Sequence, residues 1–403
     1  MTLSHEQLLT AVFEAYYDAR RNKRNTASQL RFEMNLEENL VALTEELESG
    51  RYRVGRSVCF IVTKPVKREV FAADFRDRVV HHLLFNWLSP LFERTFIDDC
   101  YSCRKGKGTL YGIRRVAQHL RRCSQNYTRP AYVLKTDIRG YFMSINRQKL
   151  LRMLFATLDR FAPRQSCHAG KRWDEAIDYA LVKGLLEKVV MNDPTEGCLV
   201  KGQRSDWNDL PADKSLFTTP KDCGLPIGNL TSQLFSNIYL AEFDHWVKRD
   251  CRQRHYGRYV DDIVVVGRSR RVLARLMRCM ENRLRGMFGL VLHPHKRILQ
   301  PASYGLNVLG MRLRRGTVLP GKRVAHNLRM VVFAYIVAMV ARPFLATARR
   351  FFSRLNSYFG MLRHCASLRL REWAGLQLCA VHPPLLLAVD SGKKVTLFSL
   401  FNF

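Results

Sequence analysis

The sequence predicts an α+β fold, and three observations lead to this prediction. Residues 1–50 carry apolar side chains at helical spacing, whereas residues 51–71 alternate and are rich in Val, Ile and Phe, as strands are. About the last eighty residues are basic and have a helical pattern at least as far as Cys379. The chain has 403 residues, of which 47% are hydrophobic, so it can form two or three subdomains that share a large core.

The segments between these two ends alternate between helix and strand. Residues 76–91 predict an apolar-faced helix that ends at Pro90, and residues 105–122 predict a basic helix after a glycine-rich turn. Residues 132–142, "YVLKTDIRGYF", predict a strand that carries Asp137 to its end, and a helical segment follows.

The second half of the chain continues this pattern. Residues 192–223 are polar and rich in Asp, Pro, Gly and Lys, which indicates a surface insertion. Residues 224–247 predict a glycine–proline turn followed by one long helix. The segment "GRYVDDIVVVG" then predicts a hairpin with a buried strand, followed by a basic helix over 270–288 and a strand near 306–313.

The charge of the chain points to a polyanionic partner. It has 66 Lys and Arg against 35 Asp and Glu, a net charge of +31, with dense basic runs at 19–24, 252–258, 268–285 and 312–323. Such an excess needs an anionic partner to offset self-repulsion, and nucleic acid is the first candidate, ahead of a membrane surface. We find no apolar run of 18 residues and no secretory signal, so we expect a cytoplasmic protein without a membrane partner.

The cysteines indicate neither a disulfide framework nor a zinc site. Their number is 11, their spacing is irregular, and Cys100 and Cys103 form a lone CxxC pair without a second one. We expect reduced cysteines, as in the cytoplasm.

Three aspartates stand beside strand-type sequence. Asp137 ends one strand, and Asp261 and Asp262 precede another. An isolated Asp-Asp pair is usually a solvated turn, but here a tyrosine precedes it, Ile-Val-Val-Val follows it, and a second strand-end aspartate lies upstream. Carboxylates that converge would repel one another unless a cation neutralises them, and oxygen ligands favour Mg²⁺. Two such ions can clamp an in-line phosphoryl displacement.

These residues resemble the motifs of reverse transcriptases, in order, over roughly residues 50–370. "KTDIRGYF" is similar to the first palm motif of that family, and "YVDD" is similar to its Tyr-x-Asp-Asp box. The resemblance implies a right-hand polymerase with an antiparallel palm sheet and a helical thumb. The implied parts are an N-terminal helical extension (1–50), fingers (51–136), a palm (137–314, with the insertion at about 192–223) and a thumb (315–403).

The resemblance also implies a two-metal Mg²⁺ site. Asp137 and Asp261 would be the firmer ligands and Asp262 the looser one, with the backbone carbonyl of Ile138 near the metal. Lys296, in "FGLVLHPHK", would protonate the departing pyrophosphate as a general acid. For an isolated lysine after a strand, a surface charge is the alternative.

Further residues are implied to meet the nucleotide and the nucleic acid. "KPVKREVF" resembles the segment that meets the incoming triphosphate, although Glu69 stands where the family usually has proline, and Phe142 stands where the family excludes the ribose 2′-OH. For Phe142, a core position is the alternative. The implied nucleotide-binding residues are Lys64, Arg68, Phe142, Ile227, Gly228 and Tyr259. "NVLGMRL" resembles the primer grip, and the implied contacts of the thumb with the template–primer backbone are Arg323, Arg329, Arg342, Arg349, Arg350 and Arg354. An ordinary amphipathic helix is the alternative for Arg349 and Arg350.

The segment "GLPIGNLTSQ" is similar to the enzymes of diversity-generating retroelements. Group II intron and retron enzymes have Pro-Gln-Gly where this chain has Pro226-Ile227-Gly228. The resemblance implies copying of a template-repeat RNA into cDNA, with errors opposite adenine, for mutagenic retrohoming into a variable gene. It also implies dNTPs, a primer and a small basic accessory protein as partners, in a bacterial host cell.

Two alternatives remain open. One is a group II intron maturase-type or retron reverse transcriptase, and the other is a non-catalytic RNA-binding scaffold.

Overall fold

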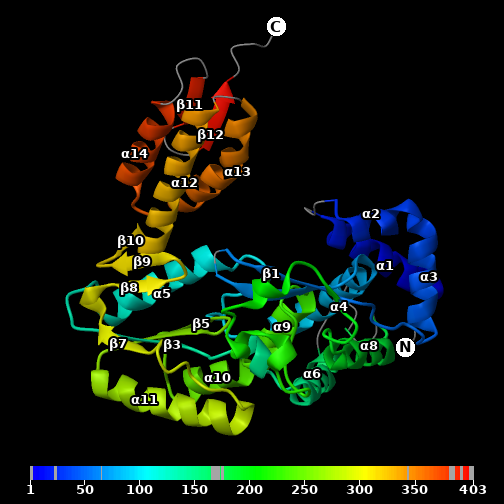
Figure 1. The fold of residues 1–403 in the computed structure, drawn as a ribbon. Helices are drawn as coiled ribbons and strands as arrows, with labels where there is room; N and C mark the ends of the chain where they lie inside the picture. The colour runs from blue at the N-terminus through cyan, green and yellow to red at the C-terminus, as the bar shows by residue number, and fades with distance from the viewer. Residues whose placement is uncertain are drawn as a thin grey trace.

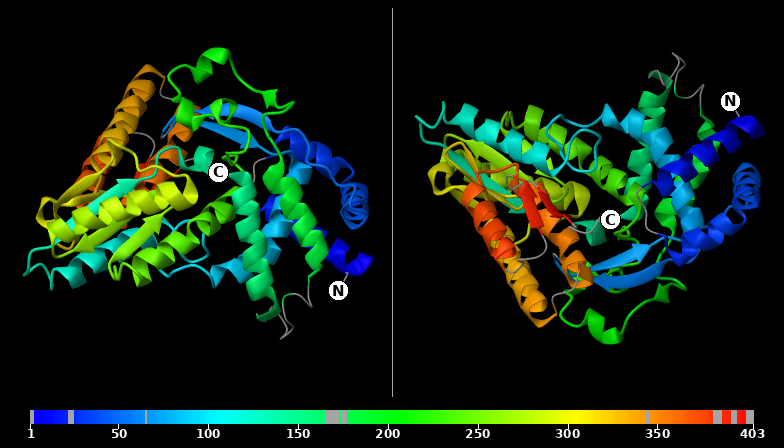
Figure 2. Two further views of the ribbon diagram at one scale, coloured as in Figure 1. Left: turned by 90° about the horizontal axis from the view of Figure 1, so that it is seen from below. Right: turned by 90° about the horizontal axis from the view of Figure 1, so that it is seen from above.

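The structure is a computed structural model that describes residues 3–21, 25–64, 66–164, 173, 177–342, 345–380, 386–390 and 394–398. A four-stranded antiparallel sheet lies at its centre, with a helical N-terminal part on one side and a separate C-terminal group of helices that rises from the other (Figure 1). The two further views in Figure 2 show the same division. An antiparallel central sheet and groups of helices together make up the fold, which confirms the α+β class.

The N-terminal helices pack around one long helix. They are α1 (His5–Arg20), α2 (Ala27–Met34), α3 (Leu36–Glu48) and the long α4 (Phe75–Glu93). The start of α1 is held by a capping box between Ser4 and Gln7, and its apolar face, which includes Leu8 and Val12, is buried in the largest core cluster. The predicted helical stretch over 1–50 is thus confirmed as three helices.

Helix α4 does not end at Pro90, as the sequence predicted, but continues to Glu93. Pro90 cannot donate a backbone hydrogen bond, yet the turn that follows it buries Leu91 and Phe92 almost completely. One turn upstream, the carbonyl of Trp87 accepts a hydrogen bond of 2.8 Å from the indole of Trp173. Core burial outweighs the helix-breaking tendency of proline here.

A small three-stranded sheet lies beside these helices. Strands β1 (Val58–Val62) and β2 (Arg68–Ala72) form an antiparallel hairpin, and β4 (Leu199–Val200) adds to β1 in parallel. The predicted insertion at about 192–223 supplies β4 and otherwise forms short 3-10 turns. It lies against the β1–β2 hairpin.

Glu69 anchors the insertion to β2. The side chain is only 1% exposed and accepts three hydrogen bonds, each of 2.7 Å, from the Trp207 indole, the Ser215 hydroxyl and the Leu216 backbone amide. A buried carboxylate is stable only when donors satisfy it, so strand and insertion are mutually dependent. The acidic residue that departs from the family pattern therefore has a structural role.

The central sheet has the order β5–β6–β3–β7, and all its pairs are antiparallel. Its strands are β3 (Tyr132–Asp137), β5 (Tyr256–Tyr259), β6 (Asp262–Gly267) and β7 (Ile298–Pro301). Alternate residues of β6 face opposite layers, because successive side chains of a strand point to opposite faces. Val264 and Val266 pack towards α5 (Thr109–Cys123), whereas Ile263 and Val265 join the core that includes α11 (Arg270–Arg283).

The outer edge of β5 is covered by the segment around Cys100. Backbone hydrogen bonds of 2.9 Å run from Tyr101 to the Arg258 carbonyl and from Arg258 to the Asp99 carbonyl. A Cβ atom at Gly257 would lie 2.0 Å from the Tyr101 hydroxyl, so this close approach requires glycine.

The long helix predicted over 224–247 is two helices, α9 (Leu230–Tyr239) and α10 (Ala241–Arg249). Two side-chain hydrogen bonds to the backbone explain the break. The carbonyl of Ser236 accepts a hydrogen bond from the Tyr141 hydroxyl, and the carbonyl of Asn237 accepts one from Arg258. These carbonyls would otherwise face the amides of residues 240 and 241, so side chains from elsewhere in the fold interrupt the helix at Leu240.

The C-terminal part begins with a three-stranded sheet and continues as a helical bundle. The strands are β8 (Leu306–Val308), β9 (Met311–Arg314) and β10 (Thr317–Pro320), and the helices are α12 (Lys322–Ala341), α13 (Leu345–Leu362) and α14 (Leu368–Cys379). Leu328, Tyr335 and Phe359 bury in a core of their own. The strands β11 (Leu386–Asp390) and β12 (Lys394–Phe398) pair at the end.

Helix α12 differs from one expectation. Among the described residues it is the one helix long and apolar enough to cross a bilayer by length and composition, whereas the sequence analysis found no such run. Leu328, Val332 and Met339 of α12 are buried against its neighbours, but only 28% of the apolar stretch is buried, and Phe333 and Val340 are exposed.

The remaining elements follow the predictions. The strands near 51–71 and 306–313, the basic helices α5 and α11, and the helical segments α6 (Arg147–Phe161) and α8 (Tyr179–Met191) all form. Helix α11 continues into a π-helical turn, Leu284–Phe288. Nine of the described cysteines, from Cys59 to Cys365, are free. The domain boundaries at 50, 136 and 314 stay predictions.

We expect Glu69→Ala to destabilise the fold by about 3 kcal/mol, because two buried donors and the half-buried Trp207 indole lose their acceptor at once. Glu69→Gln is the matched control and should lose less, since its amide oxygen can still accept. Urea unfolding followed by Trp207 fluorescence measures both, and protease cleavage within residues 199–214 should become faster in the alanine variant. An alanine variant as stable as the parent protein would contradict the anchor.

Candidate active site

The three predicted aspartates lie together at one end of the central sheet. Asp137 is the last residue of β3 and pairs directly with Asp262, the first residue of β6. Directly opposed residues of antiparallel strands point to the same face, with Cβ atoms about 5 Å apart. Asp261 occupies the turn just before Asp262, and its carbonyl accepts a hydrogen bond of 3.2 Å from the Ile138 amide. Ile138 itself is buried.

The turn that carries Asp261 has an unusual backbone. Val260 and Asp261 form the two-residue loop between β5 and β6, and Val260 has φ +56°, in the left-handed region. A β-branched residue is strained there, at a cost of about 1–2 kcal/mol. Two hydrogen bonds hold it: the Val260 amide donates to the Ser102 hydroxyl at 3.1 Å, and Arg258 donates to the Val260 carbonyl at 2.9 Å.

Arg258 is held in turn by a buried carboxylate. Its side chain is 0% exposed and forms a bidentate pair with Asp244 of α10, with distances of 2.7 Å and 2.8 Å. Burial alone would lower the pKa of Arg258, but the Asp244 carboxylate holds it well above its ordinary value. Tyr256 also donates to Asp244, and Asn237 accepts from Arg258 and from Ser102.

Lysines partly neutralise the carboxylates. Lys296 lies 3.0 Å from both oxygens of Asp137, and Lys135 lies 3.3 Å from Asp262. Asp261 has no such partner among the described side chains. Burial, followed by the charges of Asp137 and Asp262, raises the pKa of Asp261 to about 6. Burial also raises the pKa of Asp262, although Lys135 opposes the shift.

The donor set fits a hard divalent cation. The three carboxylates lie at the same end of the sheet, and the surroundings of Asp261 disfavour its charged form. Ions such as Mg²⁺ bind through carboxylate oxygens and substrate phosphates. Within the described residues, no group of three His, Cys, Asp or Glu side chains is already arranged around a metal position. The lysines hold two of the carboxylates instead.

Phe142, Ile227 and Gly228 meet beside β2. Phe142 and Ile227 both pack against a small apolar cluster that includes Phe71 and Met143. The Phe71 amide donates to the Ile227 carbonyl at 2.9 Å, and the Leu225 amide donates to the Phe142 carbonyl at 2.9 Å. Gly228 has φ +135°, and a Cβ there would lie 2.6 Å from the Phe71 carbonyl oxygen, so only glycine fits.

The other predicted contacts lie further out. Lys64 and Arg68 are exposed at the tip of the β1–β2 hairpin, and Tyr259, at the end of β5, packs against the cluster between α5 and the sheet. Of the predicted thumb contacts, Arg323, Arg329, Arg342, Arg350 and Arg354 are exposed in the C-terminal bundle. Arg329 also lies over the Trp373 ring at 5.9 Å. The side chain of Arg349 lies outside the described residues. The roles of all these residues stay predictions.

Sequence reasoning missed the residues that support the aspartates. Arg258, Asp244, Ser102, Asn237 and Lys135 have no local pattern that marks a function. A signal was nevertheless present, because Arg258 is a charged residue inside an apolar strand next to the Asp-Asp pair, and such a residue needs a buried partner.

Comparison with known proteins agrees with this geometry. Residues 186–313 match the family model for reverse transcriptase (RNA-dependent DNA polymerase), a span that includes Asp261, Asp262 and Lys296. The chain therefore contains an RNA-directed DNA polymerase domain, and the right-hand polymerase fold is confirmed. Protein YkfC of Escherichia coli (strain K12) is 24% identical over 213 residues, which are 52% of this chain and 45% of that protein. The chain thus spans about half the length of this relative.

Two solved telomerases also resemble the fold. One is apo telomerase from Candida tropicalis, truncated from its C-terminal domain, with 11% identity and a TM-score of 0.46 over 70% of this chain and 60% of that one. The other is telomerase from Candida albicans with a fragment of telomeric RNA, with 9% identity and a TM-score of 0.47 over 88% of this chain and 59% of that one. No functional argument rests on these likenesses.

We expect Asp261→Asn to stabilise the metal-free protein at neutral pH. Because the pKa of Asp261 is raised to about 6, its protonated form contributes stability below the ordinary aspartate pKa of about 4, and this contribution is lost as the pH rises through 6. The asparagine side chain stays neutral, so the variant does not lose this stability as the pH rises. Its melting temperature should therefore exceed that of the parent protein near pH 7.5 and approach it near pH 4.5.

Mg²⁺ should raise the melting temperature of the parent protein more than that of the variant. Asp250→Asn, on the exposed end of α10, is the matched control and should show neither effect. A variant that is less stable than the parent protein at neutral pH would contradict this account of Asp261.

Proposed function

We propose that the whole chain is an enzyme that copies RNA into DNA. The observation that carries the proposal is the pairing of Asp137 with Asp262, with Asp261 in the adjoining turn, in a chain that has a reverse transcriptase domain. A scaffold would have no need to bury and converge carboxylates at a cost in folding free energy.

The chain's own residues suit this chemistry. Asp137, Asp261 and Asp262 would hold two Mg²⁺ ions, which supply charge neutralisation at the reacting phosphate. Arg258 and Ser102 keep the turn in position, so that Asp261 is presented before substrate binds. Lys296, already beside Asp137, is placed to give a proton to a departing pyrophosphate when the carboxylate releases it.

We further propose that the enzyme belongs to the diversity-generating retroelement type. The support is the segment "GLPIGNLTSQ" and the apolar Ile227, which packs near Phe142 where the implied steric gate stands. In this proposal it copies a template-repeat RNA into cDNA with errors opposite adenine, for retrohoming into a variable gene. dNTPs, a primer and a small basic accessory protein would be its partners in the cytoplasm of a bacterial host cell.

The first test is primer extension with Mg²⁺. Asp137→Asn and Asp261→Asn should each reduce the extension rate by about 10³-fold or more, because losing a metal ligand raises the barrier by several kcal/mol. RNA affinity, measured by fluorescence anisotropy, should stay within about twofold, since neither residue is a phosphate-binding cation.

Asp250→Asn again serves as the control and should extend primers at the normal rate. Full extension by either active-site variant would reject the site. If the parent protein binds RNA but does not extend primers, even with the accessory protein added, the result would favour the non-catalytic RNA-binding scaffold.

A second test addresses Ile227. A glutamine there could hydrogen-bond near the sugar and base of the incoming nucleotide, whereas isoleucine holds the new pair by shape alone. One hydrogen bond is worth about 0.5–1.5 kcal/mol, a factor of about two to twelve in discrimination. Discrimination should fall first for the adenine–thymine pair, because it has two hydrogen bonds and not three. Ile227→Gln should therefore lower misincorporation opposite adenine severalfold and leave the other template bases nearly unchanged.

Ile227→Leu is the matched control, because it keeps the apolar packing and adds no hydrogen bond. Sequencing of cDNA made on one RNA by all three enzymes provides the error rates. If the glutamine and leucine variants change the adenine rate equally, Ile227 acts through packing and the selective role is wrong.

A further inference from the structure

A basic surface lies at the end of the central sheet that is remote from the aspartates. Three elements that are far apart in the sequence contribute to it: the end of α5, the loop between α10 and β5, and the turn from β6 into α11. Its exposed arginines are Arg121, Arg122, Arg254, Arg268, Arg270 and Arg271. We call this set the distal basic surface.

Hydrogen bonds hold the three elements together. Arg268 donates to the carbonyl of Cys123 at the end of α5, at 3.2 Å. The Val266 amide of β6 donates to the carbonyl of His255 in the loop, at 2.9 Å. Burial, followed by the neighbouring His119, Lys248, Arg122 and Arg254, lowers the pKa of His255 to about 4. The six arginines are therefore carried by elements that hydrogen bonds fix to one end of the sheet.

The protein does not neutralise this surface. None of the six arginines takes part in a salt bridge among the described residues, whereas the neighbouring Arg115 and Lys248 both pair with Asp99. Arg270 and Arg271 also occupy the first turn of α11, where the helix dipole disfavours cations. Six exposed charges at one end of the sheet, none of them in a salt bridge among the described residues, raise the free energy of the folded chain unless an external anion offsets them.

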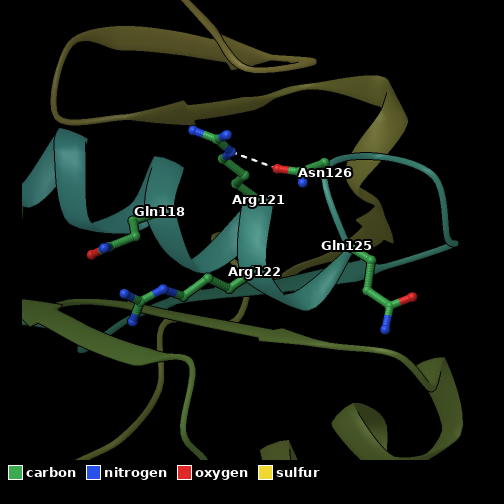
Figure 3. A pocket seen from close by; sticks show the side chains of 5 residues that line it. All are labelled: Gln118, Arg121, Arg122, Gln125 and Asn126. Carbon is green, nitrogen blue, oxygen red and sulfur yellow. Dashed lines mark hydrogen bonds between the residues drawn. The ribbon is translucent and has the colours of Figure 1, made fainter.

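Neutral hydrogen-bonding groups accompany the charges. A shallow hollow at the end of α5 is lined by Gln118, Arg121, Arg122, Gln125 and Asn126, and Arg121 donates to the Asn126 side chain (Figure 3). Guanidinium and amide groups are the side chains that contact phosphate and sugar oxygens of nucleic acids. A membrane-binding surface would need an apolar face. Helix α5 has no exposed large hydrophobic side chain, and in α11 Val272 is the one such side chain.

The surface is separate from the aspartates. Strand β6 runs from Asp262 to Gly267, so Gly267, the residue before Arg268, lies about 17 Å along the sheet from Asp262. Helix α11 also lies on the side of the sheet away from the C-terminal helices, as Figures 1 and 2 show. A nucleic acid on this surface would not be the part that is being copied.

We propose that the distal basic surface binds the sugar–phosphate backbone of a folded RNA segment outside the copied region. This inference rests on the proposed function only in taking the partner to be the template RNA. Its effect would be to hold the template on the enzyme while the copied stretch moves past the aspartates.

The experiment compares two quadruple variants of the full chain with equal loss of charge. The first is Arg121→Gln, Arg122→Gln, Arg254→Gln and Arg271→Gln. The second is the control, with glutamine at Arg31, Arg51, Arg152 and Arg160, which are exposed, form no salt bridge among the described residues and lie elsewhere. Since all eight side chains are on the surface, melting temperatures should stay close to that of the parent protein.

The probes are a long, structured fluorescent RNA, a short primed template, and vesicles of phosphatidylcholine with phosphatidylserine. The surface variant should bind the long RNA about 10- to 100-fold more weakly near 0.1 M salt, and the slope of log affinity against log salt should fall in magnitude by about 2 to 3. The control variant should change much less, and primer extension at saturating short template should be unaffected.

Three results would overturn the proposal. Equal losses in the two variants would mean that the charge acts only in bulk. A loss of vesicle binding with RNA affinity unchanged would assign the surface to a membrane. Slower extension on the short template would place the surface in the copying site. RNA binding is measured without polymerisation, so a failure of the proposed enzymatic activity would leave this test intact.

Discussion

The ion pair between Arg258 and Asp244 connects the active site to the body of the protein. Removing one member of such a buried pair typically costs about 3–5 kcal/mol, whereas replacing both by apolar side chains can be neutral. The main role of the pair is therefore to position the surrounding elements, and its net contribution to stability is secondary. One guanidinium group contacts Asp244 on α10, Asn237 on α9 and the carbonyl of Val260 in the turn. Two helices and a strand are thereby aligned with the residue that precedes Asp261, and the break between α9 and α10 is part of the same arrangement.

The electrostatics of the site follow from this rigid support. The hydrogen-bonded turn keeps Asp261 close to Asp137 and Asp262, and the pKa of Asp261 is raised first by its burial and then by the charges of these two carboxylates. Lys135 and Lys296 moderate the repulsion among them from the side. The folded chain thus stores an unfavourable arrangement that a divalent cation would relieve, which is a common way for a protein to prepare a binding site in advance.

The extent to which the sequence predicted this structure depended on how local each signal was. Asp137, Asp261 and Asp262 could be placed because each adjoins a strand-type run, and strand ends in one sheet tend to meet. The continuation of α4 past Pro90 and the α9–α10 break could not be predicted, because their causes lie far away in the sequence. These causes are the core that buries Leu91 and Phe92, and the side chains of Tyr141 and Arg258. Glu69 is similar: as a sequence feature it departs from a family pattern, and only the fold reveals the three donors around it.

The covered edge of β5 has a consequence for how copies of this chain behave together. An exposed strand edge offers unpaired amides and carbonyls to any other strand, which invites aggregation. Here the Asp99–Tyr101 backbone occupies that edge, and the opposite edge strand, β7, ends in Pro301, which lacks an amide donor. Many molecules could therefore crowd onto one long polyanion without their sheets joining. The chain can thus bind a polyanion without its central sheet binding the central sheet of another copy, which matters for a protein with a net charge of +31.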